Sequence, residues 1–110
     1  MQTSTTSVWE TSSAGQLSAV LAAISDVQTM QSFLRDAMTE KEIIEISSRL
    51  EAAKMLQEGK KYTEIIVKTK LSSRTIARIS DWIQNGQGGY EAALAIVNTH
   101  PSHISPDRAE

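Results

Sequence analysis

Hydrophobic residues recur every three or four positions along most of the chain, which is the spacing of one face of an α-helix. This periodicity predicts helices at about 17–24, 27–38 and 40–57. A capping-box pattern that begins at Thr39 opens the third helix, and Gly59 is the residue type that commonly ends one. No strand-like alternation of polar and apolar residues persists for more than a few positions.

The periodic segments become shorter after residue 59. They predict helices at about 63–69 and 73–84, separated by a three-residue break, and a last helix at about 90–97. The glycine-rich stretch Asn85–Gly89 separates the last two. Together these segments predict an all-α fold, a helical bundle of about six helices.

The two ends of the chain differ from this periodic middle. Residues 1–15 are mostly Ser and Thr, a composition that buries too little apolar surface to become ordered. Residues 98–110 contain both prolines and both histidines. We therefore expect a folded domain at 16–97 between two flexible tails, with Trp9 as a free aromatic in the first tail rather than one that docks onto the domain or a partner.

The two short helices around the break have the outline of a helix-turn-helix unit at about 63–84. Ile65 and Leu71 fit its buried positions in the first helix and the turn, and Ile76 with Ile79 fits those of the second helix. Lys70 stands where such turns usually have Gly. The alternative is an ordinary pair of amphipathic helices within a bundle.

Charge is segregated along the chain in a way that favours DNA binding. Residues 54–78 carry seven basic and two acidic side chains, a net charge of +5, whereas the whole chain has a net charge of −2. This excludes a globally basic nucleic-acid binder and indicates a local basic surface. The candidate DNA-binding residues are Lys61, Lys68, Lys70, Ser72, Ser73, Arg74, Thr75 and Arg78.

Several other classes of protein are not supported by the residues. The chain has no cysteine, no apolar run long enough to span a membrane and no signal-peptide pattern, so we expect a cytoplasmic protein without membrane contact. His100 and His103 have no third metal ligand near them, and Gly86–Gly89 lacks the Lys and Ser/Thr of a phosphate-binding loop. No catalytic set converges, so we expect neither a metal site nor an enzyme.

Three stretches carry a resemblance to a known family: Thr39–Gly59, Tyr62–Arg78 with its Thr-Ile-x-Arg core, and Trp82–Tyr90. The last is similar to a Trp-Leu-x-x-Gly-x-Gly-Gly-Tyr signature. The chain thus resembles, over about residues 15–97, the Trp repressor superfamily and within it the TrpR-like YerC/YecD branch. The resemblance implies an intertwined homodimer with one helix-turn-helix per protomer and a role in transcriptional regulation.

The resemblance also implies a vestigial corepressor pocket. Positions that match ligand-contacting residues of the Trp repressor are Thr39, Arg49 and Arg78. Ile79 stands where the repressor has a small Gly, and Trp82 stands where it has Ser, so these large side chains would fill the space of a planar ligand. We therefore expect no cofactor, tryptophan included. We hypothesise that both residues take the place of the ligand and hold the recognition helix in its DNA-binding orientation at all times. An ion pair with Glu45 is the alternative role of Arg49.

The combined prediction is a homodimeric transcriptional regulator that binds double-stranded DNA at specific sequences. Repression is its favoured mode, and no small-molecule effector is identified. The helix from Ser73 to about Gln84 would enter the major groove, with Arg74 contacting a base and nearby lysines contacting phosphates. The alternative is a helical, dimeric protein–protein interaction module that does not bind DNA.

Overall fold

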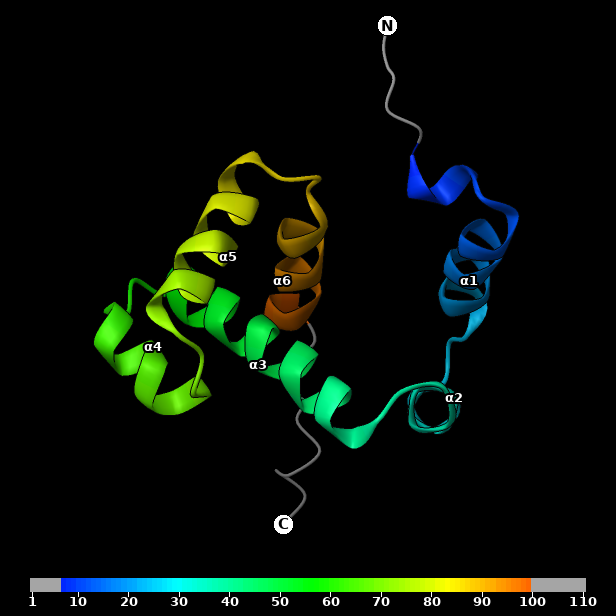
Figure 1. The fold of residues 1–110 in the computed structure, drawn as a ribbon, viewed down its shortest axis with the longest axis horizontal. Helices are drawn as coiled ribbons and strands as arrows, with labels where there is room; N and C mark the ends of the chain where they lie inside the picture. Colours follow the sequence, from blue (N-terminus) through cyan, green and yellow to red (C-terminus); the bar gives the residue numbers. More distant parts are fainter. Residues whose placement is uncertain (1–6, 100–110) are drawn as a thin grey trace, which may run out of the picture. The chain divides into compact units, whose positions relative to one another are not determined.

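The computed structural model describes residues 7–99, and within that range it contains helices and no strands (Figure 1). The elements are a short 3-10 helix η1 (Val8–Glu10) and the α-helices α1 (Ser12–Ala23), α2 (Val27–Ala37), α3 (Glu40–Gln57), α4 (Tyr62–Thr69), α5 (Ser73–Asn85) and α6 (Gly89–Thr99). This confirms the predicted all-α fold. The chain divides into two compact units, Met1–Ile43 and Ile44–Glu110.

The first unit begins inside the segment that we expected to be a tail. The Ser7 side chain accepts the Trp9 backbone N–H at 3.2 Å and starts η1. The backbone of Trp9 then passes so close to Gly15 that a Cβ there would lie 3.0 Å from the Trp9 carbonyl oxygen. Helix α1 starts at Ser12, and Trp9 is 58% exposed. The predicted tail at 98–110 overlaps the end of α6 and otherwise lies outside the described residues.

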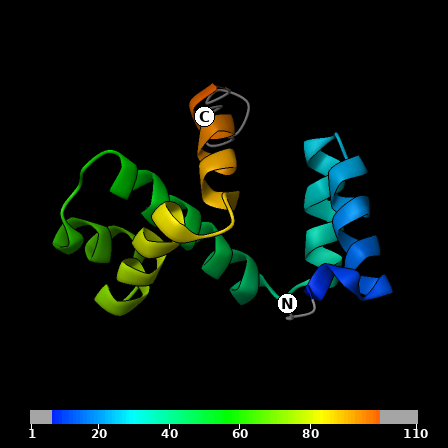
Figure 2. The same ribbon diagram turned by 90° about the horizontal axis from the view of Figure 1, so that it is seen from above.

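Helices α1 and α2 are joined by a short connection (Figure 2). Neither helix buries a residue completely. The Asp26 carboxylate caps α2 by accepting the backbone N–H and the hydroxyl of Thr29, both at 2.8 Å. The apolar side chains of the unit remain half-buried or exposed: Leu17, Val20, Leu21, Ile24, Val27, Met30, Phe33, Leu34 and Met38. A helical segment of this kind has apolar surface available for a partner.

Both predicted ends of α3 are confirmed. Thr39 and Glu42 form the capping box, with the Thr39 hydroxyl accepting the Glu42 N–H at 3.0 Å and the Glu42 carboxylate accepting the Thr39 N–H at 2.8 Å. Gly59 has φ 81° and ends the helix in a Schellman motif, in which the Lys60 N–H reaches the Met55 carbonyl at 3.0 Å.

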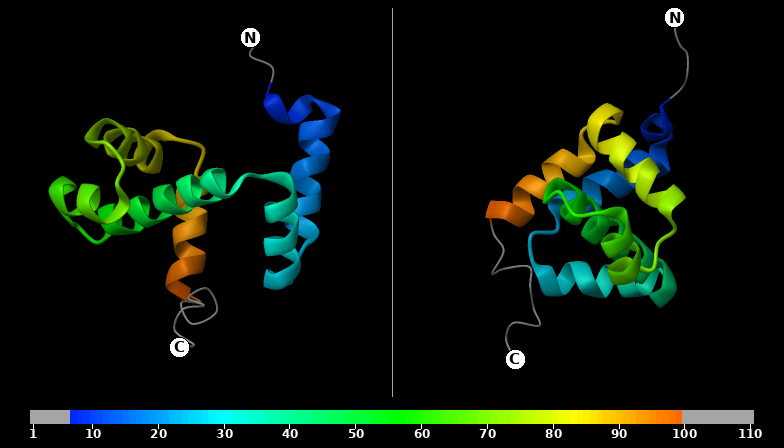
Figure 3. Two further views of the ribbon diagram at one scale, coloured as in Figure 1. Left: turned by 60° about the horizontal axis from the view of Figure 1, so that its bottom comes forward. Right: turned by 90° about the vertical axis from the view of Figure 1, so that its left-hand side faces the viewer.

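The core of the second unit lies where α4, α5 and α6 meet the C-terminal part of α3 (Figures 1 and 3). Helix α3 contributes two buried alanines to this core. The fully buried residues are Ala52, Ala53, Ile65, Ile76, Ile79 and Leu94. The inward positions that the sequence predicts for the two short helices are therefore confirmed.

Candidate nucleic-acid interface

The break between α4 and α5 is a tight, internally bonded turn. Lys70 takes the left-handed conformation, with φ 65° and ψ 12°, and donates its N–H to the Ile66 carbonyl at 2.8 Å. The buried Thr69 hydroxyl donates to the Ile65 carbonyl at 2.7 Å and accepts the Leu71 N–H at 3.2 Å. The turn thus has the backbone geometry that Gly usually supplies, although the residue is Lys.

Helix α5 starts at a side-chain cap. Ser72 accepts the Thr75 N–H at 3.1 Å and donates its hydroxyl to the Thr75 hydroxyl oxygen at 3.1 Å. Because both hydroxyls take part in this cap, Ser72 and the half-buried Thr75 are less available for contacts with DNA than the sequence suggests. Ser73 and Arg74 are exposed at the same helix end.

The basic residues among the candidate DNA-binding residues are all exposed, and none of them has an ion-pair partner within residues 7–99. Arg74 and Arg78 lie one turn apart on α5, on the side opposite the buried Ile76 and Ile79. The remaining members come from α4, its N-cap and the turn: Lys61, Lys68 and Lys70. Since α4 packs against α5, these cations belong to one helix-turn-helix unit.

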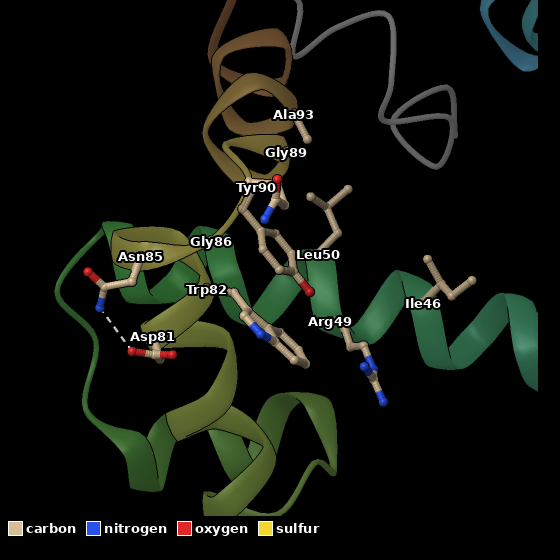
Figure 4. Close-up of a pocket in the computed structure, with 11 residues that line it drawn as sticks. Ile46, Arg49, Leu50, Asp81, Trp82, Asn85, Gly86, Gly89, Tyr90 and Ala93 are labelled. Atoms are coloured by element: carbon tan, nitrogen blue, oxygen red, sulfur yellow. Dashed lines mark hydrogen bonds between the residues drawn. The ribbon is translucent and has the colours of Figure 1, made fainter. Parts of the chain in front are cut away.

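An open apolar groove of about 840 Å³ lies beside this unit, between α3, α5 and the start of α6 (Figure 4). Ile46, Leu50, Trp82 and Tyr90 form much of its lining, together with Arg49. Burial raises the pKa of the Tyr90 phenol above its ordinary value, and the positive charge of Arg49 partly opposes that rise.

The residues that the resemblance placed around a ligand have different local surroundings in the structure. Ile79 is fully buried in the core, whereas Trp82 is 40% exposed and lines the groove without filling it. The two side chains thus have different surroundings, and the expectation that both fill the space of a planar ligand stays a prediction. Arg49 lines the groove and its guanidinium lies 3.9 Å from the Glu45 carboxylate, which is the alternative role considered for it. Thr39 caps α3, and Arg78 is not part of the groove lining.

The glycine-rich signature has a steric explanation. A Cβ on Gly86 would lie 2.4 Å from the Trp82 carbonyl oxygen, and Gly88 has φ 87°. These two glycines let the chain reverse so that Tyr90 reaches the groove. Sequence reasoning did not identify Tyr90 as a groove residue; its place directly after the glycines is the signal that indicates it.

A second feature was also missed by sequence reasoning. Asp81 and Asn85 are exposed on α5, and the Asn85 amide donates a hydrogen bond to the Asp81 carboxylate at 2.9 Å. Their spacing of four residues on a predicted helix indicates such contact. In the described part of the chain, no three His, Cys, Asp or Glu side chains are placed to hold a metal ion, and His100 and His103 lie outside that part.

Residues 7–99 form helices, and two of these make a capped helix-turn-helix whose second helix carries arginines without an ion-pair partner in that range. These features define the helix-turn-helix class. Within that class the chain belongs to the Trp repressor family: the family profile described as Trp repressor protein matches residues 12–98. That family consists of helical regulators and not of enzymes. No helix within residues 7–99 is both long and apolar enough to cross a membrane.

Two relatives support the same assignment. The uncharacterized protein YerC of Bacillus subtilis (strain 168) is 35% identical over 79 residues, which make up 72% of this chain and 76% of YerC. The crystal structure of a TrpR-like protein from Eubacterium eligens ATCC 27750 is 31% identical and has a TM-score of 0.76. The match covers 82% of this chain and 93% of that one, which confirms the resemblance found in the sequence.

Proposed function

We propose that this protein is a sequence-specific regulator, most simply a repressor, that binds double-stranded DNA in the cytoplasm as a homodimer. The observation that carries the proposal is the pair of exposed arginines on the outward side of α5, Arg74 and Arg78, which have no ion-pair partner among residues 7–99. Membership of a family of helical DNA-binding regulators supports it. No small-molecule effector is specified by the proposal.

The proposed mechanism follows from the position of each side chain. Helix α5 enters the major groove with its N-terminus first, as the recognition helix of helix-turn-helix proteins does. Arg74 then reaches a base edge, and guanine offers the two acceptors that a guanidinium binds best. Ser73 and Thr75 lie beside it, and the backbone N–H groups of Ser73 and Arg74 face phosphate at the positive end of the helix dipole.

The lysines of the unit supply affinity rather than sequence preference. Lys61, Lys68 and Lys70 are exposed and carry charges that phosphates attract regardless of base identity. Arg78 lies one turn after Arg74 and serves as a further phosphate contact. In this arrangement the turn and the two helices position the cations, while Arg74 provides most of the discrimination.

We also propose that a second copy of the chain covers the apolar side chains of α1 and α2. Neither helix buries a residue completely, and Leu17, Val20 and Val27 are exposed. An intertwined homodimer would cover such surface and place two recognition helices about 34 Å apart, one turn of DNA. The corepressor positions Thr39, Arg49 and Arg78 remain as a vestige in this proposal, with no tryptophan bound.

The test is a titration of the full chain against a pool of random duplexes at low and moderate salt, with the mass in solution measured on the same sample. We expect a dimer that enriches a sequence with two half-sites. If four cations per protomer contact phosphates, log K should fall with log salt at a slope of about −7.

The control is the double variant Arg74→Ala, Arg78→Ala, which removes the two exposed guanidinium groups on which the proposal rests and leaves the core intact. A wild-type dimer that ignores DNA even at low salt would overturn the proposal. It would favour the alternative, a helical interaction module without DNA binding.

A further inference from the structure

One acidic side chain lies on the outward side of the basic helix. Asp81 is the only acid in α5 and stands seven residues after Arg74, two helical turns further along the same side. The distance along the helix axis is about 10 Å at the usual rise per residue. Arg78 lies between them, so cations occupy the first half of this side and an anion occupies the second.

The Asp81 carboxylate is held in place by a neutral side chain. Asn85, one turn further on, donates its amide to one carboxylate oxygen at 2.9 Å (Figure 4). An amide is neutral, so this contact orients the carboxylate without compensating it. Within residues 7–99 no cation pairs with Asp81, and Arg49, which lines the same groove, pairs with Glu45.

We propose that Asp81 is a specificity-determining residue that acts through repulsion of the DNA backbone, an inference that rests on the proposed DNA binding. When α5 enters the major groove with its N-terminus first, its second half lies toward the phosphates. Non-specific binding comes almost entirely from cation–phosphate attraction, so a fixed anion there weakens it. The specific complex has the base contact of Arg74 to offset the same repulsion, and the ratio of specific to non-specific affinity rises.

The variant Asp81→Asn isolates the charge. Asn has the same shape and keeps a carbonyl oxygen that can accept from Asn85, so only the negative charge is lost. We expect its affinity for a non-specific duplex at low salt to rise about threefold per protomer, or about tenfold for a dimer, the size of a close like-charge pair in water. The salt slope should become steeper by up to about 2.

The matched control is Asp36→Asn, which makes the same change of net charge on an exposed acid of α2. Its non-specific affinity should stay within about twofold of wild type. The specific duplex selected from the random pool serves as the second probe, and its affinity should rise less than that of the non-specific duplex. Circular dichroism verifies that both variants keep the wild-type helix content.

Three results would overturn the inference. Asp81→Asn with unchanged non-specific affinity would show that the carboxylate lies away from phosphates. An equal gain in Asp36→Asn would show an effect of net charge alone. A loss of specific affinity with constant non-specific affinity would show that Asp81 reads a base, such as the amino group of cytosine. Wild-type protein that binds no duplex at all would instead refute the proposed function itself.

Discussion

Thr69 and Leu71 are joined by a hydrogen bond across the turn of the helix-turn-helix: the Thr69 hydroxyl accepts the Leu71 backbone N–H at 3.2 Å. The same hydroxyl donates to the Ile65 carbonyl at 2.7 Å, and Thr69 is only 7% exposed. One buried side chain therefore ties the end of α4 to the start of the break. The direction in which α5 leaves the turn depends on this contact.

We expect Thr69→Val to lower the free energy of unfolding by about 1–3 kcal/mol, because Val has nearly the same shape but leaves the partly buried Leu71 N–H without its hydrogen-bond partner. Urea titration followed by circular dichroism measures the change. Thr63→Val is the control, since Thr63 is exposed on the same helix, and it should stay within about 0.5 kcal/mol of wild type. Equal effects of the two substitutions would contradict the assigned role of Thr69.

Two substitutions of Lys70 distinguish the effect of backbone strain on stability from the effect of its charge on DNA binding. Its left-handed conformation is unfavourable for any side chain with a Cβ, so Lys70→Gly should be about 0.5–1 kcal/mol more stable than Lys70→Ala. Both variants lose the same positive charge and should weaken DNA binding to the same extent. Thermal melts and duplex titrations of the two proteins provide the comparison. A glycine variant less stable than the alanine variant would mean that this conformation is not strained.

Arg74→Ala should weaken binding to the selected duplex by about 1–3 kcal/mol and relax the sequence preference at one position of each half-site. Lys68→Ala should instead weaken binding to all duplexes alike and make the salt slope shallower by about 1 per protomer. Lys41→Ala, an exposed cation at the start of α3, is the control and should do neither. Uniform weakening by Arg74→Ala would show that Arg74 contacts phosphate only.

The Tyr90 phenol should lose its proton at higher pH than an ordinary tyrosine, because burial against the groove disfavours the phenolate and raises its pKa. The folded chain then holds a proton that the unfolded chain releases at about pH 10, so stability falls as the pH rises above that value. The variant Tyr62→Phe leaves Tyr90 as the one tyrosine, and phenolate absorbance follows its titration. Tyr90→Phe should abolish this part of the alkaline loss of stability.

Much of the fold could be predicted from the sequence because its signals are local. The capping box at Thr39, the Schellman end at Gly59 and the inward Ile76 each depend on neighbours within a few residues. The short helix η1 could not be predicted, because the Ser7 hydroxyl caps it by accepting the Trp9 N–H in a stretch whose composition indicates a tail.

The groove was harder to predict because it depends on the rotation of α5 about its axis. Ile79 and Trp82 are three residues apart, and the family resemblance implies that both lie in the space of one ligand. In the structure the rotation of α5 buries Ile79 with Ile76 and leaves Trp82 at the groove. Tyr90 joins that groove through packing of segments about forty residues apart, Leu50 and Tyr90, which periodicity does not report.

The same rotation leads to a prediction about tryptophan. Ile79 stands where the Trp repressor pattern has Gly, and its burial closes that position, while Arg49 is already paired with Glu45. We expect millimolar L-tryptophan to leave the melting temperature and the DNA affinity unchanged. The melt is a sensitive assay, since a ligand at a hundred times its Kd would add about 2.7 kcal/mol of stability.

Trp82→Ser restores the small residue of the Trp repressor pattern, and its melting temperature should also remain unchanged by tryptophan, because Ile79 rather than Trp82 closes the site. Stabilisation of the wild type by tryptophan would contradict the hypothesis that the recognition helix keeps its DNA-binding orientation without a ligand. Stabilisation of Trp82→Ser alone would show that Trp82 is the residue that excludes the ligand.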